Sequence, residues 1–267
     1  MGKIRYIIWE ETKRTLGNRN SLILILSVVI LGMLESISIG TNNEWTNGIL
    51  VLFTMNKETV LHNEYLVFSH VAASMKGSYF IMFMPLIVGL AVIPVLSEDW
   101  ESGRTRYVLM KCGKIKMLLG KLAASCISGG VIMFCGYMLA VAIMYTKLDH
   151  NVSFWALSAS YGGVFIEGAI CALWCFLVSS FVRNPYLLAC IPYIFLWFVE
   201  RKTSAWFLEE VEVNKVQLYV YEVSQLVGNF FYDKQFAVQI LLFYTVIAVL
   251  AMGLHLFMMR RRGDCGQ

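Results

Sequence analysis

Residues 122–145, LAASCISGGVIMFCGYMLAVAIMY, form an apolar run without a single charged side chain. A membrane-spanning helix needs about 20 mostly apolar residues, because a rise of about 1.5 Å per residue must cover roughly 30 Å of hydrocarbon. The run therefore predicts a helix that crosses a membrane. Five further segments have the same character: 21–40, 78–96, 160–181, 186–199 and 236–259. We expect an all-α polytopic membrane protein with six transmembrane helices, forming one domain over residues 1–267.

The composition of the whole chain agrees with this fold class. The protein has 267 residues, of which 58% are hydrophobic and 15% charged, and its mean hydropathy is +0.64. Soluble chains average about 25% charged residues, so the composition excludes an ordinary soluble enzyme and a disordered tail. The seven cysteines lie in apolar runs or basic segments, and we predict no disulfide bonds.

Lys and Arg residues predict the orientation of the chain, because cytoplasmic loops retain them. With the N-terminus inside, the inner segments hold 15 of these residues and the outer segments hold 7. Both termini are therefore expected in the cytoplasm. The basic residues are spread between apolar runs rather than gathered in one stripe, so we expect contact with membrane lipid and no nucleic-acid partner.

Two segments leave alternatives open. Residues 1–20 place Ile4, Ile7 and Ile8 on one helical stripe, which predicts a helix lying on the inner membrane surface. This helix is either a simple topological anchor or a mechanical link between a cytosolic partner and the first span. The short segment 186–199 contains Pro192, which either kinks a helix or begins a re-entrant turn.

Motifs for enzymatic chemistry are lacking. The stretch from Gly113 to Lys121 has the wrong spacing for a phosphate-binding loop and lacks the hydroxyl residue. Glu10 and Glu11 precede the first span, and the histidines have no partner at the spacing of a metal site. We expect neither catalytic residues, nor a metal, nor a cofactor in this chain, and we interpret His255 as a packed or interfacial side chain.

The segment between the second and third spans carries the strongest pattern. Glu98, Asp99 and Glu101 stand at its start, and Arg104, Arg106 and Lys111 follow. Acids complement the start of a helix and bases its end, and Gly113 can end such a helix. We expect a short amphipathic helix on the cytoplasmic face, with Tyr107, Val108 and Leu109 available for contacts with a soluble partner.

This segment resembles a signature of ABC-2 type transporter permeases. The resemblance rests on Glu101-x-Gly103, followed by Val108-Leu109, a basic stretch and Leu118-Leu119-Gly120-Lys121. Six spans with cytoplasmic ends and an inner surface helix are also similar to that family. The proline that such permeases often carry shortly after the paired leucines of the signature is replaced here by Cys112-Gly113.

The resemblance implies a coupling helix that docks into a separate cytosolic ATPase, which would hold ATP and Mg²⁺. The docking residues it implies are Glu98, Asp99, Trp100, Glu101, Ser102, Gly103, Arg104, Tyr107 and Leu109. It further implies a second permease copy or homologue and a place in the bacterial plasma membrane. Small members of the family resemble exporters of bacteriocins, peptide toxins and phenol-soluble modulins, so amphipathic or antimicrobial peptides are the expected cargo. Drug, lipid or ion export, and a secondary carrier working without an ATPase, are the alternatives.

Two carboxylates fall within the predicted spans. Glu35 lies late in the first and Glu167 about a third of the way into the fourth. Such groups are costly in a membrane and commonly mark a polar cavity or a paired partner. Both carboxylates either line a transport pathway that opens outward or pair with a group such as Arg201. For Glu35 a further alternative is that its side chain reaches the membrane interface.

Overall fold

The computed structural model describes residues 2–38, 45–54, 71, 75, 78–97, 108, 110–146, 148, 153, 161–208 and 234–261. These residues are mostly helical. Each of the six segments predicted as a span overlaps one helix of the structure. A small pair of strands is the addition that the all-α prediction missed.

The helices and strands follow one another along the chain with the following bounds. They are α1 Gly2–Leu16, α2 Arg19–Leu34, β1 Ser36–Ser38, β2 Trp45–Asn47, α3 Gly48–Thr54, α6 Ser78–Leu96, α9 Lys114–Tyr145, α11 Gly163–Ser179, α12 Pro185–Leu208 and α15 Lys234–Arg261. Strands β1 and β2 are antiparallel, with Ile37 opposite Thr46.

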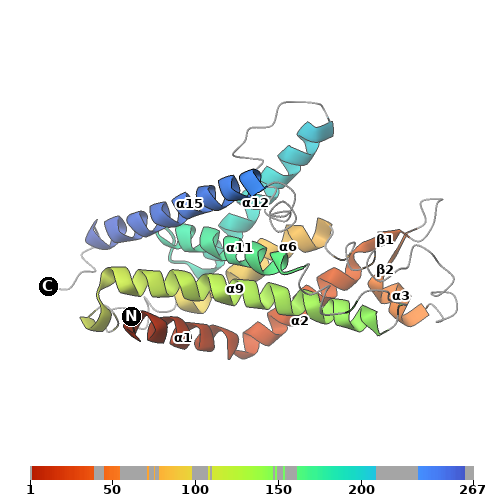
Figure 1. The fold of residues 1–267 in the computed structure, drawn as a ribbon, viewed down its shortest axis with the longest axis horizontal. Helices are drawn as coiled ribbons and strands as arrows, with labels where there is room; N and C mark the ends of the chain where they lie inside the picture. Colours follow the sequence, from red (N-terminus) through yellow and green to blue (C-terminus); the bar gives the residue numbers. More distant parts are fainter. Residues whose placement is uncertain are drawn as a thin grey trace.

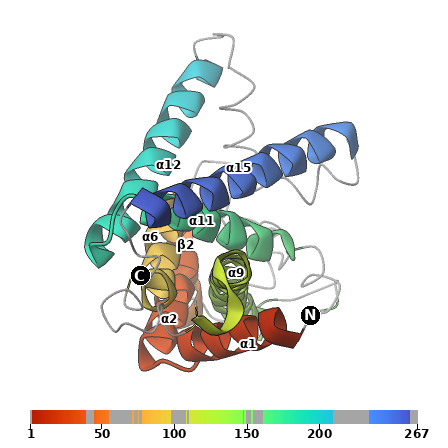
Figure 2. The same ribbon diagram turned by 90° about the vertical axis from the view of Figure 1, so that its left-hand side faces the viewer.

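The central element is α9, which runs the length of the molecule (Figure 1). Viewed along its axis, α1 and α2 lie below α9, α11 lies above it, and α15 crosses over α11 (Figure 2). Helix α9 makes its most extensive contacts with α11, α1 and α2, while α6 packs against α12, α9 and α11. The main apolar core accordingly lies between α2, α6, α9 and α11.

The predicted boundaries are corrected in several places. The first span was expected to reach residue 40, but α2 ends at Leu34 and residues 36–38 form β1. The helix stops there because Glu35 turns into the interior and bonds another helix. Helix α9 starts at Lys114, earlier than expected, and α12 continues through Pro192 as one helix, so the re-entrant alternative is wrong.

Two helices of the described chain are long and apolar enough to cross a membrane: α9, and residues Val238–Arg261 of α15. Ile4–Leu16 and Arg19–Leu34 qualify together, but they are bent by 66° at the break between them. Met82–Leu96, Gly163–Ser179 and Pro185–Phe198 are apolar and shorter. The structure is thus that of a mostly helical protein with candidate membrane spans, and the number of six spans and the cytoplasmic termini stay predictions.

Helices α9 and α11 touch at the level of their backbones. A Cβ atom on Gly168 would lie 2.6 Å from the carbonyl oxygen of Gly129, and one on Gly129 would lie 2.8 Å from that of Gly168. Small residues permit this close approach. The resulting van der Waals contact stabilises the helix pair in a membrane, because lipid provides no hydrophobic driving force for helix association. Any larger side chain at Gly168 must push the two helices apart.

We expect Gly168→Ala to destabilise the fold by about 1–3 kcal/mol, because the added methyl group overlaps a backbone oxygen that cannot turn away. The measurement is thermal unfolding of the purified chain in a mild detergent. Gly253→Ala on α15 is the matched control, since its Cβ would meet nothing within 4 Å. Equal unfolding temperatures for the two variants would contradict the close α9–α11 contact.

Candidate functional site

The residues expected to dock a partner lie outside the part of the chain that the structure describes. These are Glu98, Asp99, Trp100, Glu101, Ser102, Gly103, Arg104, Tyr107 and Leu109. The structure does describe the two ends of that segment. One end is the last turn of α6 with Ser97, and the other is Val108, residues 110–112 and the start of α9.

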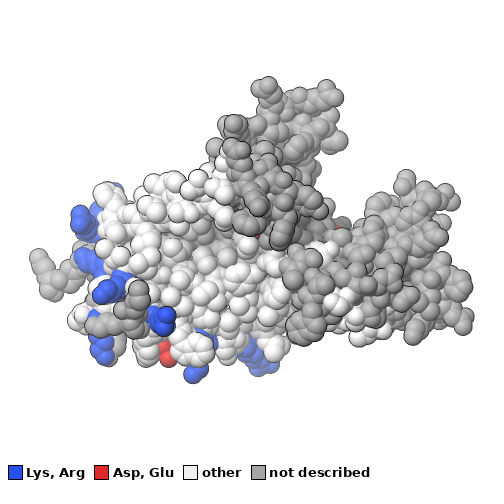
Figure 3. Space-filling model, in the orientation of Figure 1, with Lys and Arg blue, Asp and Glu red and all other residues white. Residues whose placement is uncertain are grey.

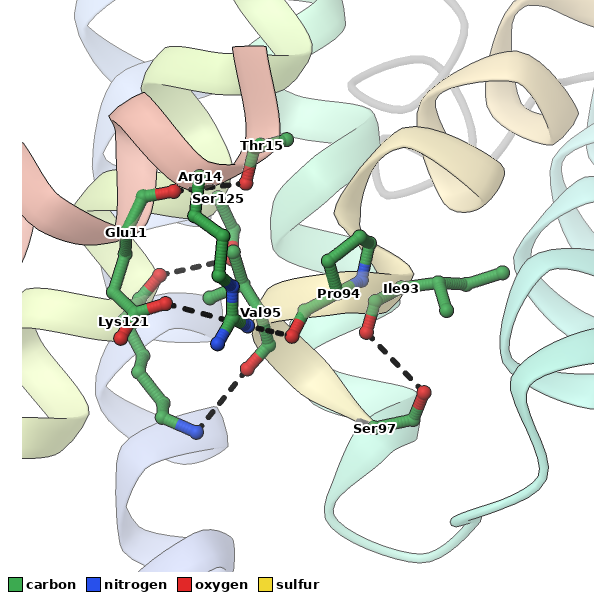
Figure 4. Close-up of polar contacts among 9 residues, drawn as sticks. All are labelled: Glu11, Arg14, Thr15, Ile93, Pro94, Val95, Ser97, Lys121 and Ser125. Atoms are coloured by element: carbon green, nitrogen blue, oxygen red, sulfur yellow. Dashed lines mark hydrogen bonds and ion pairs between the residues drawn. The ribbon is translucent and has the colours of Figure 1, made fainter. Parts of the chain in front are cut away.

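The end of α6 is held by two cations from other helices. Helices leave their last carbonyl groups without partners inside the helix, and here Arg14 of α1 donates a hydrogen bond from Nη2 to the carbonyl oxygen of Pro94. Lys121 of α9 donates from Nζ to the carbonyl oxygen of Val95, 3.1 Å away. We call Arg14, Lys121 and these two carbonyl groups the α6 anchor (Figure 4). Positive charge at a helix C-terminus also interacts favourably with the helix dipole.

Helix α1 supplies the support for Arg14. Glu11 is 2% exposed and forms an ion pair with Arg14, with 3.4 Å between Oε2 and Nη2. Thr15 donates its hydroxyl hydrogen to the carbonyl oxygen of Glu11 at 3.0 Å, and Ser21 of α2 donates to that of Thr15. A surface helix would carry all its charged residues on the side that faces solvent. In α1, Glu11 is buried instead. Arg14 joins α1 to α6.

Lys121 is placed by the packing of α9 against α1. Its side chain is buried, at 5% exposed, which is rare for a lysine unless its ammonium group is paired. At the preceding residue, Gly120, a Cβ atom would lie 2.5 Å from Cγ2 of Ile7 in α1. The absence of a side chain at Gly120 thus lets α1 approach α9 directly beside the anchor.

The other end of the segment is marked by a change of backbone direction. Residues 110–112 are helical, Gly113 has a φ of 78°, and α9 begins at the next residue. A positive φ is readily adopted by glycine, which has no Cβ. Gly113 therefore separates the segment from α9, as the sequence predicted. Val108 is half-buried and packs against the main core.

Glu35 stabilises the opposite end of α6. Its carboxylate oxygen Oε1 accepts a hydrogen bond from the backbone amide of Phe80, in the first turn of α6, at 2.6 Å. A carboxylate at a helix N-terminus satisfies an otherwise unpaired N–H group and complements the dipole. Glu35 is 4% exposed, so its side chain points into the interior of the protein.

Glu167 is also enclosed. It is fully buried in α11 and lies close enough to Tyr137 of α9 to interact with it electrostatically. The Tyr137 ring packs edge-on against Phe80, with the centroids 5.5 Å apart, and the Tyr137 and Tyr161 side chains are joined by a hydrogen bond. Phe80 thus links the surroundings of Glu35 to those of Glu167. The predicted partner Arg201 lies in α12, and its side chain is outside the described part of the structure.

His255 joins α15 to α11. Its Nε2 atom lies 2.9 Å from the carbonyl oxygen of Phe176 and 3.1 Å from the hydroxyl oxygen of Ser179. The side chain is buried, so the interpretation as a packed histidine is confirmed. Among the described residues, no group of three or more His, Cys, Asp or Glu side chains is arranged to hold a metal ion.

The roles of Arg14 and Lys121 in holding α6 were not predicted from the sequence, in which both count only among the basic residues of the inner segments. A faint signal existed for each. Arg14 follows Glu11 at the helical spacing of three, and Lys121 follows a glycine at the start of an apolar run. Searches of the sequence against protein-family models and against curated proteins find no match.

Lys121→Met is expected to lower the free energy of unfolding by about 1–3 kcal/mol, because the Val95 carbonyl then loses a buried donor. Hydrogen exchange of the amides in the last turn of α6 should also become faster. Lys13→Met is the control, since Lys13 is an exposed lysine on α1. If both variants exchange and unfold alike, the α6 anchor does not hold the helix.

Glu35→Gln and Glu35→Leu separate hydrogen bonding from charge. Glutamine keeps an oxygen that can accept the Phe80 N–H, whereas leucine leaves this amide unpaired at a cost of about 1–3 kcal/mol. We therefore expect the leucine variant to unfold at a clearly lower temperature than the glutamine variant. A glutamine variant as unstable as the leucine variant would show that the negative charge itself is what the site requires.

Proposed function

We propose that this chain is the permease subunit of an ATP-driven exporter, in which a separate cytosolic ATPase acts on the segment between α6 and α9. The observation that carries the proposal is the α6 anchor. It joins the helix before the segment to α9, the helix after it, and to α1. A force applied to such a segment reaches three helices at once.

The bent pair of α1 and α2 extends this linkage along α6. Arg14 on α1 bonds the last turn of α6, and Glu35 at the end of α2 bonds its first turn. Both ends of α6 are thereby tied to two consecutive helices that meet at a 66° bend. In the proposed mechanism, closure of the ATPases around ATP moves α6, α1 and α2 together. ATP shifts the conformational equilibrium toward the closed state, because it binds that state more tightly.

The distribution of charge supports the proposed orientation. Lys and Arg side chains gather toward the end of the molecule at which α1 begins and α15 ends, and along the neighbouring edge over α1 (Figures 1 and 3). Basic residues are retained on the cytoplasmic side of membrane proteins. In our proposal this end faces the cytoplasm of a bacterium and the chain lies in its plasma membrane. ATP and Mg²⁺ are held by the partner ATPase, and this chain has no enzymatic activity.

The resemblance to ABC-2 permeases supports the remaining assignments. We propose a second copy or a homologue as the other half of the permease, and amphipathic or antimicrobial peptides as the cargo. Glu98, Asp99, Trp100, Glu101, Ser102, Gly103, Arg104, Tyr107 and Leu109 would contact the ATPase. Export of drugs, lipids or ions by the same machinery, and carriage without an ATPase, are the alternatives.

Co-expression with an ABC ATPase tests this function. We expect a stable complex whose ATP hydrolysis is stimulated by an amphipathic peptide. Glu101→Lys and Val108→Pro should abolish most of the stimulation while membrane insertion is retained, because one reverses a docking charge and the other interrupts the helix.

Glu10→Lys is the matched control, since it reverses a charge on α1 outside the segment. Stimulated hydrolysis that survives in both test variants would refute the docking assignment. Peptide export by the chain alone in sealed vesicles would refute the ATP-driven mechanism and favour a secondary carrier.

A further inference from the structure

A cavity lies between the start of α9 and the end of α15, at the basic end of the molecule. Its volume is about 420 Å³. Three cationic side chains line it, Lys114 and Lys116 from α9 and Arg260 from α15, together with the apolar residues Ile115 and Leu256. The cavity is separate from the α6 anchor and has no role in the function proposed above.

The electrostatics of this cavity favour an anion. None of the described residues that line it is acidic, and the ion pair that the structure describes, between Glu11 and Arg14, lies elsewhere. Three like charges around one hollow repel one another, so a bound anion would stabilise their arrangement. Gly113 on the rim has open space where a side chain would stand, which leaves the cavity accessible.

The apolar surroundings indicate what kind of anion fits. Ile115 in the wall is 57% exposed, and Phe257, which directly follows the lining residue Leu256 on α15, is 59% exposed. Both helices belong to the candidate membrane spans. A ligand here would therefore meet positive charge at the ends of the helices and exposed apolar side chains along them. An amphiphile with an anionic head satisfies both surfaces, and basic pockets between spans are known to hold lipid phosphates.

We propose that this cavity binds the phosphate headgroup of an anionic phospholipid, with its acyl chains lying along α9 and α15. Lys114, Lys116 and Arg260 would contact the phosphate oxygens, and Ile115 and Leu256 the start of the acyl chains. The lipid would then join the C-terminal helix to α9. The proposal requires only that the chain lies in a membrane, and does not depend on an ATPase.

The test uses the full-length chain in a neutral detergent, titrated with phosphatidylglycerol or phosphatidylcholine and observed by native mass spectrometry. We expect phosphatidylglycerol to be retained in preference to phosphatidylcholine. Replacing Lys114, Lys116 and Arg260 together by glutamine should weaken this binding on the order of 100-fold, since each basic residue contributes a factor of about five. The charge-conserving set Lys114→Arg, Lys116→Arg and Arg260→Lys should bind as the wild type does.

The control set removes the same number of charges from α1 and the start of α2, with Arg5, Lys13 and Arg19 replaced by glutamine, all exposed and outside the cavity. Equal losses in the two glutamine sets would show a general surface potential and overturn the proposal. Competition by inorganic phosphate at the affinity of the lipid would identify a free phosphate as the ligand instead. Unchanged lipid binding in the cavity set, with loss of binding to a co-expressed ATPase, would assign these cations to an acidic protein surface.

Discussion

A helix that ends within an apolar bundle must find hydrogen-bond partners for its last backbone groups, because neither the core nor a lipid supplies them. Helix α6 meets this constraint at both ends through side chains of other helices. The Glu35 carboxylate accepts from an amide of its first turn, and Arg14 and Lys121 donate to carbonyl groups of its last turn. The signs of these charges are also the ones that the helix dipole favours.

The same contacts organise the helices around α6. Arg14 lies in α1 and Glu35 directly follows α2, and these two helices, which are bent by 66° at their junction, place one charge at each end of α6. Beside Lys121, the absence of a side chain at Gly120 lets α1 pack closely on α9. Farther along α9, the backbone contact of Gly129 with Gly168 holds α11. Local events at the segment between α6 and α9 are thus connected to most of the described bundle, which is the property that a coupling element requires.

The positions of the long helices could be predicted because uninterrupted apolar runs leave the chain few alternatives in a membrane. Segment 78–96 coincides with α6, and 236–259 lies within α15. The first span was predicted too long for a physical reason that is visible only in three dimensions. Counting apolar residues past Glu35 ignores that its carboxylate is drawn to the start of α6. Glu35 and Glu167 were recognised as unusual from the sequence, but their burial and neighbours were not.

By itself, the sequence determined that this is a mostly helical chain with membrane-spanning character, since that follows from composition and run length alone. It also determined where charge must be concentrated, because Lys and Arg are nearly absent from the apolar runs. The tertiary structure decided which of those charges are buried and what they hold. Arg14 and Lys121 are 107 positions apart in the chain, yet each reaches a carbonyl group of the same turn. No local pattern encodes such a meeting, because it depends on how closely the backbones of α1, α6 and α9 approach.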